Sequence, residues 1–100
     1  MFIAHVSFCV SKEDRAFALN TLLDQVEAVR SMPGCIAFVP FLDPTDMESV
    51  RVLHEWKSQK DMERYTGSQS FAVVGQALRP IMLSPPISKR FDAELIETVN

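Results

Sequence analysis

Two kinds of hydrophobic periodicity alternate along this chain, and their order constrains the fold more than any other feature. Residues 2–10 are rich in β-branched and aromatic types, which predicts a strand with one oily and one mixed face. Apolar residues then recur at helical spacing over 12–31, after a capping-box pair of Ser11 and Asp14, until Met32-Pro33-Gly34 stops the run. The start of the chain therefore predicts a strand followed by one helix.

The rest of the chain predicts a hairpin, a broken helical region and a last strand. Two further strands are expected at 35–42 and 49–56, joined by the turn residues of 43–46. A helical region follows from Ser58 to Pro80, and Gly67-Ser68 divides it in two. Imperfect alternation from Lys89 to Val99 predicts a final strand, exposed on one side or exchanged with a partner.

The order strand, helix, strand, strand, helix, strand is typical of a ferredoxin-like α+β sandwich, here as a single domain over residues 1–100. Its four-stranded antiparallel sheet carries both helical regions on one face. The other face is too apolar for water in either orientation, because it includes several of Ile3, Cys9, Val39, Phe41, Val50, Val52 and Leu53. A second copy is the simplest cover, so the sequence predicts a homodimer.

Charge and composition exclude several classes of partner. A net charge of -3 and a pI near 5.3 leave no basic surface for nucleic acid. No apolar run approaches the length of about 20 residues that spans a bilayer, and no signal peptide is recognisable. We therefore expect a cytoplasmic protein that does not associate with a membrane. Cys9 and Cys35 lack metal-ligand spacing, and we interpret both as buried free thiols with no metal.

Short motifs resemble those of the antibiotic biosynthesis monooxygenase domains, whose fold is the dimeric α+β barrel. They are the turn Met32-Pro33-Gly34-Cys35, the strand end Glu55-Trp56-Lys57-Ser58, the helix start Gly67-Ser68-Gln69-Ser70-Phe71 and the helix end Leu78-Arg79-Pro80. The resemblance implies oxidation of a small aromatic or quinol by O2 without metal, flavin or haem. Many members carry a His where Tyr65 stands. Haem-degrading relatives place a Trp there and an axial His at Gly75, so haem ligation is not expected.

Three residues are the candidates for catalysis. His54 is a candidate base because its imidazole titrates near neutral pH, and it shares a strand face with Trp56. Trp56 would stack on a planar substrate or donate its indole N–H. Tyr65, next to Gly67, would direct its hydroxyl into a cleft. The alternative for all three is a structural role in the core.

Five further residues are candidates for a substrate pocket. His5 and Ser7 lie on the more polar face of the first strand and line a pocket only if that face is enclosed. Arg51 shares one side of the third strand with Glu55, and Arg90, near the start of the last strand, would pair with a carboxylate or an acidic substrate. Phe71 belongs to the apolar stripe of the second helical region, and Met82 is a flexible gap filler.

Three functions are compatible with these residues. The first is a cofactor-independent monooxygenase that uses His54 as base, with Trp56 and Tyr65 shaping the pocket. The second is an isomerase of a small phosphorylated signalling metabolite, which a pocket containing Arg51 or Arg90 would favour. The third is a non-catalytic module that binds a small ligand.

Overall fold

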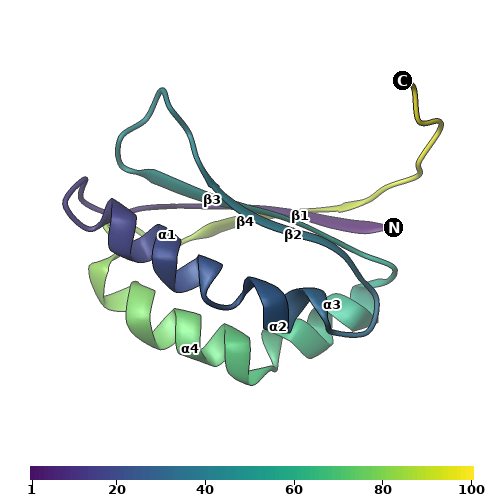
Figure 1. Cartoon of the computed structure of the whole chain (residues 1–100), viewed down its shortest axis with the longest axis horizontal. Helices are drawn as coiled ribbons and strands as arrows, with labels where there is room; N and C mark the ends of the chain where they lie inside the picture. Colours follow the sequence, from purple (N-terminus) through teal and green to yellow (C-terminus); the bar gives the residue numbers. More distant parts are fainter.

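The computed structural model describes all residues from Met1 to Asn100, and they form one four-stranded sheet covered on one face by helices (Figure 1). The elements in chain order are β1 (Phe2–Cys9), α1 (Arg15–Leu23), α2 (Val26–Arg30), β2 (Cys35–Leu42), β3 (Ser49–Trp56), α3 (Gln59–Thr66), α4 (Gln69–Leu78), a short 3-10 helix η1 (Arg79–Ile81) and β4 (Ile87–Asp92). The strand order is β2-β3-β1-β4, with every pair antiparallel. The predicted ferredoxin-like α+β fold is confirmed.

The first predicted helix is wrong in its start and in its continuity. Ser11 and Asp14 form a turn ahead of the helix, in which the Asp14 N–H donates to the Ser11 carbonyl at 2.9 Å, and α1 begins only at Arg15. A turn at residues 24–25 then separates α1 from α2. Leu22 before this turn and Val29 after it are both buried, so each of the two short helices contributes to the core.

The second helical region breaks as predicted. The Ser58 hydroxyl accepts a bond from the Asp61 N–H at the start of α3, and the Ser68 hydroxyl accepts one from the Phe71 N–H at the start of α4, each at 3.3 Å. These caps satisfy helix donors that have no partner within the helix. No helix in the chain is both long and apolar enough to cross a membrane.

The last strand was predicted too late and too long. β4 begins at Ile87, directly after Pro85-Pro86, and ends at Asp92, which pairs with Phe2. No residue of β1 remains beyond that pair to extend the ladder. The final backbone bonds join Met1 and Ala93, at 2.6 and 2.7 Å. Beyond them the chain leaves the sheet with no regular structure, and Figure 1 shows it rising on the side away from the helices.

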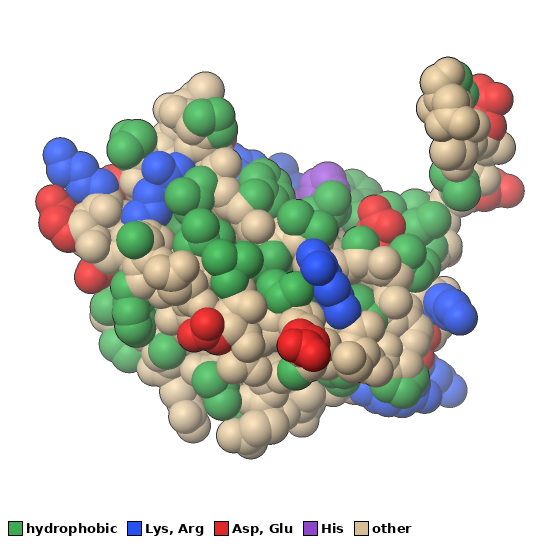
Figure 2. All heavy atoms as spheres, in the orientation of Figure 1, with side chains coloured by type: hydrophobic (Ala, Val, Ile, Leu, Met, Phe, Trp, Pro, Cys, Tyr) green, Lys and Arg blue, Asp and Glu red, His purple; other side chains and the backbone are tan.

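The helix-free side of the sheet, which we call the open face, is largely apolar. Val39, Phe41, Ile87 and Phe91 are each between 40% and 57% exposed. Figure 2 shows hydrophobic side chains gathered over the strands. Of the residues predicted for such a face, Val50 and Val52 are instead buried in the core, and Ile3, Cys9, Val39, Phe41 and Leu53 alternate with the buried residues of their strands.

Both edge strands of the sheet contain residues that disfavour pairing with a further strand. β2 forms one edge and contains Pro40, and β4 forms the other and contains Lys89 and Arg90. A proline has no N–H to donate, and charged side chains discourage further pairing.

One buried cation fastens the β2–β3 turn to the first helix. Arg15 is 9% exposed, and its guanidinium donates to the backbone carbonyls of Asp43 at 2.6 Å, Asp46 at 2.9 Å and Ser49 at 3.2 Å. Three carbonyls of one loop thus share a single side chain as donor.

Replacing Arg15 with Met should lower the free energy of unfolding by about 2 kcal/mol, because the charged donor is lost while its carbonyl acceptors remain. Chemical denaturation measures this change. Arg64→Met is the matched control, because Arg64 lies in an exposed pair with Asp61. We expect the control to lose less than about 1 kcal/mol of unfolding free energy. Equal losses in both variants would contradict a stabilising role of the Arg15 hydrogen bonds.

Candidate functional site

A cavity of about 220 Å³ lies between the sheet and helices α3 and α4, on the helix-covered side. Its apolar lining comes from both layers and comprises Val6, Phe8, Leu22, Val52, Met62, Phe71, Val74, Met82 and Pro86. Among these side chains stand a few polar groups, and the ones that matter chemically are His54, Tyr65, Arg79 and Arg90. An apolar cavity with a small number of convergent polar groups is the usual form of a small-molecule site.

His54 is held by the residue two positions along the same strand. The Trp56 indole N–H donates to His54 Nδ1 at 2.7 Å, and both side chains are buried. Because an indole nitrogen only donates, Nδ1 must be the acceptor, and the proton of the neutral ring sits on Nε2. Nε2 forms no bond within the chain, yet no fully buried polar side-chain atom lacks a partner. Nε2–H is therefore not fully buried, and His54 is one of the residues that line the cavity.

Burial also keeps the His54 ring neutral. Removal from water, together with a smaller contribution from the positive charge of Arg90, lowers the pKa of His54 to about 4. Near neutral pH the ring is uncharged and its accessible nitrogen already carries a proton. This geometry suits a hydrogen-bond donor better than the general base expected from the sequence.

Tyr65 supplies a second donor. Its ring stacks on Trp56 with centroids 5.6 Å apart and meets His54 edge-on at 5.6 Å. Burial raises the pKa of Tyr65 to about 12, with a smaller contribution from Cys35, so the hydroxyl stays protonated. The hydroxyl has no bond within the chain and is not fully buried, and Tyr65 is one of the residues that line the cavity.

Arg79 and Arg90 give the cavity its charge. They come from η1, directly after α4, and from β4, and no carboxylate lines the cavity. Arg79 was missed by the sequence analysis. Its position four residues after Gly75 was the available signal, because that spacing puts both on one helix face. A Cβ added at Gly75 would lie 3.6 Å from Arg79 Nε, an ordinary contact distance, so the two residues are neighbours on this face.

The structure divides the predicted site residues between two places. His54, Tyr65, Phe71 and Met82 line the cavity. Trp56 is fully buried and does not line it, and it lies behind His54, to which it donates its hydrogen bond. The remaining three candidates, His5, Ser7 and Arg51, lie together on the open face, across the sheet from the cavity.

Residues 1–76 match the model of the family described as antibiotic biosynthesis monooxygenase. The chain belongs to this family. A comparison with curated proteins found no match. The family assignment therefore rests on the match over the first three quarters of the chain, which contains β1 through most of α4 and so includes His54 and Tyr65.

Solved structures show the same fold as this family member. A Deinococcus radiodurans protein proposed to be an antibiotic biosynthesis monooxygenase is 17% identical, with a TM-score of 0.89 over 100% of this chain and 99% of that one. A Nitrosomonas europaea protein proposed to have the same role is 14% identical, with a TM-score of 0.88 over 93% and 98%. A conserved protein from Methanosarcina mazei Go1 is 18% identical, with a TM-score of 0.85 over 94% of each chain.

Proposed function

We propose that the protein is a cofactor-independent monooxygenase that oxidises a small phenolic or quinol-type substrate with O2 in the cavity beneath the sheet. One observation carries the proposal. In a member of this family, an apolar cavity with two arginines and no acid is lined by His54 and Tyr65, whose Nε2–H and hydroxyl donors have no bond within the chain.

The chain's residues would act by stabilising negative charge. A phenol bound near two neutral donors and two guanidinium groups is more acidic, so it binds as the phenolate without a protein base. O2 takes electrons from this anion and forms a C–O bond at a ring carbon that carries hydrogen. Loss of water from the resulting hydroperoxide leaves a quinone. One oxygen atom enters the product and the other leaves as water, so no external reductant is needed.

Arg79 and Arg90 further favour a substrate with a second anionic group. A guanidinium binds a carboxylate through two parallel hydrogen bonds. The aromatic body of the substrate would occupy the apolar part, between Phe71 and Met82. We therefore propose a carboxylated phenol or quinol as the substrate class.

The proposal includes a homodimer formed through the open face. One chain leaves Val39, Phe41, Ile87 and Phe91 without cover. Two such faces stacked on one another would hide them from water, as sheets do in other layered folds. The cavity itself is formed within each chain, so each subunit would hold its own site.

Oxygen uptake tests the enzymatic part of the proposal. Purified protein with quinols that carry or lack a carboxylate should consume O2 under air faster than the same quinols alone. His54→Ala should reduce kcat at least about 100-fold, because one preorganised donor to an oxyanion is worth this much. Arg90→Gln should mainly raise KM for the carboxylated quinol.

Arg64→Gln is the matched control, because Arg64 lies on the exposed side of α3 and does not line the cavity. It should keep wild-type uptake. Uptake that does not depend on protein, or that His54→Ala leaves unchanged, would contradict the monooxygenase proposal. Absence of uptake with any quinol would favour a non-catalytic ligand-binding module.

The presence of Arg90 in the cavity supports a second candidate, an isomerase of a small phosphorylated metabolite. A phosphate would take the same guanidinium pair as a carboxylate. The two candidates differ in their need for O2. Conversion of a phosphorylated ketose under nitrogen, followed by NMR, would support the isomerase, whereas strict dependence on air supports the oxygenase.

A further inference from the structure

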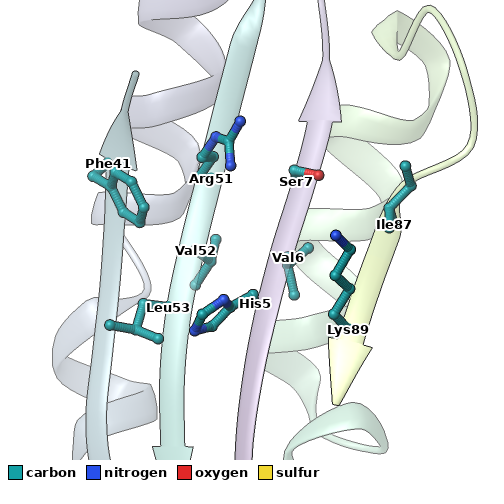
Figure 3. Close-up of a pocket in the computed structure, with 9 residues that line it drawn as sticks. All are labelled: His5, Val6, Ser7, Phe41, Arg51, Val52, Leu53, Ile87 and Lys89. Atoms are coloured by element: carbon teal, nitrogen blue, oxygen red, sulfur yellow. The ribbon is translucent and has the colours of Figure 1, made fainter. Parts of the chain in front are cut away.

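A second hollow, of about 200 Å³, lies on the open face, and nothing in the proposed oxygenation uses it (Figure 3). Its lining comes from all four strands and comprises His5, Val6, Ser7, Phe41, Arg51, Val52, Leu53, Ile87 and Lys89. Val6 and Val52 also line the cavity beneath the sheet. The hollow and the cavity are thus back to back, with these two valines between them.

Strand register brings the polar residues of the hollow together. Ser7 pairs with Arg51 on β3, and His5 pairs with Lys89 on β4. Since residues two apart on β1 point to the same side, Arg51, Ser7, His5 and Lys89 form a diagonal across three strands. Figure 3 shows the Arg51 guanidinium and the Lys89 ammonium extending toward Ser7 from opposite sides.

The hollow carries positive charge that the chain compensates only in part. Arg51 approaches one carboxylate, that of Asp43, at 3.5 Å, and Lys89 forms no ion pair. No carboxylate is among the lining residues. Glu55, the acidic residue of the open face, stands in the next row of the sheet, where it pairs with Ile3.

The surroundings of these cations would strengthen their hold on an anion. Phe41, Leu53 and Ile87 line the hollow beside Arg51 and Lys89, which are exposed in the single chain, so a second copy over the open face would be needed to exclude water from these charges. Charge-assisted hydrogen bonds gain strength where water is excluded. Covering this face without an anion would instead remove Lys89 from water with no partner, which is costly.

We infer that the hollow is a binding site for a small oxyanion, of the phosphate or carboxylate class. Arg51 provides a planar pair of donors, Lys89 a point charge, and Ser7 and His5 further side-chain donors. A volume near 200 Å³ is below the range of about 300 to 1,000 Å³ found for drug-sized ligands, so the ligand is small. The site needs residues of one chain only, and in the proposed dimer the anion would be enclosed between the two sheets.

Calorimetric titration with inorganic phosphate at constant ionic strength tests this site. We expect one phosphate per chain, with a dissociation constant at least about 10-fold weaker in both Lys89→Gln and Arg51→Gln, since a charge-assisted bond contributes more than about 1.4 kcal/mol. Acetate titrated in the same way distinguishes a phosphate site from a carboxylate site. Lys60→Gln, at an exposed position of α3, is the matched control and should bind phosphate like the wild type.

Three results would overturn the inference. Equal phosphate affinity in wild type, Lys89→Gln and Arg51→Gln would mean that the hollow is not the site. Loss of binding in Arg90→Gln instead would place the anion in the cavity beneath the sheet. Absence of phosphate binding would contradict the site. If Glu55→Gln then weakened the dimer as much as Lys89→Gln does, Lys89 would pair with Glu55 of the partner subunit. Circular dichroism of each variant confirms folding, and Ser7→Ala gives a milder, few-fold test. None of these readouts depends on oxygen uptake.

Discussion

Replacing Val39 with Lys is expected to convert a dimer at micromolar concentration into single chains. Val39 is 40% exposed in one chain, and it lies on the open face opposite Leu53. A lysine there would have to leave water on association, and it would add to the positive charge of Arg51 and Lys89. A two-fold interface contains each substitution twice. We expect a dissociation constant at least about 1,000-fold weaker, which is about 4 kcal/mol.

Sedimentation equilibrium measures the effect, and Phe17→Lys is its control. Phe17 is 54% exposed on helix α1, on the other side of the molecule. The same kind of substitution there should leave the dimer intact. A wild-type protein that sediments as a single chain at micromolar concentration would contradict the proposed dimer. Equal dissociation by both variants would show that association does not use the open face.

The second large effect is a loss of stability in acid that depends on His54. The pKa of His54 is about 4 in the folded chain, against 6.5 for an ordinary histidine. Between these values the unfolded chain binds a proton at this residue and the folded chain does not. Stability from this residue is therefore complete above about pH 6.5 and falls as the pH drops toward 4. The pKa difference corresponds to about 3 kcal/mol.

Urea denaturation at a series of pH values, at one protein concentration, detects this loss. His54→Gln should have a flatter stability profile between pH 4 and pH 6.5, because glutamine does not titrate. His5→Gln, which changes the other histidine and leaves His54 in place, should retain the loss of stability that His54 causes over this range. If the His54 and His5 variants lost stability identically over this range, the buried neutral ring would not be the cause.

Much of the fold was predictable because local signals and tertiary pairing agree. The strands at 35–42 and 49–56 have the predicted bounds, since turn residues and helix caps mark their ends. The last strand was misplaced because its limits depend on pairing with β1, 80 to 90 residues earlier, as the pairs of Ile87 with Ser7 and of Asp92 with Phe2 show. Alternation within residues 89–99 contains no information about that distant partner.

The candidate site was predictable only in part. Shared strand geometry correctly brought His54 and Trp56 together, and the helix break placed Tyr65 beside them. The sequence left open which face of β1 is covered, so residues from both sides of the sheet were assigned to one pocket. The direction of the Trp56 hydrogen bond, which decides the tautomer of His54, depends on side-chain orientation that periodicity does not encode.

Pro40 has a consequence for how copies of this chain can assemble. An apolar sheet with free edges is a template for endless strand addition. Here one edge lacks a donor at Pro40, and the other presents Lys89 and Arg90, so growth along the ladder is blocked at both ends. Face-to-face stacking of two chains about a two-fold axis, by contrast, would bury the apolar open face in one association step. The chain can thus keep one apolar sheet face without a free edge that favours fibre formation.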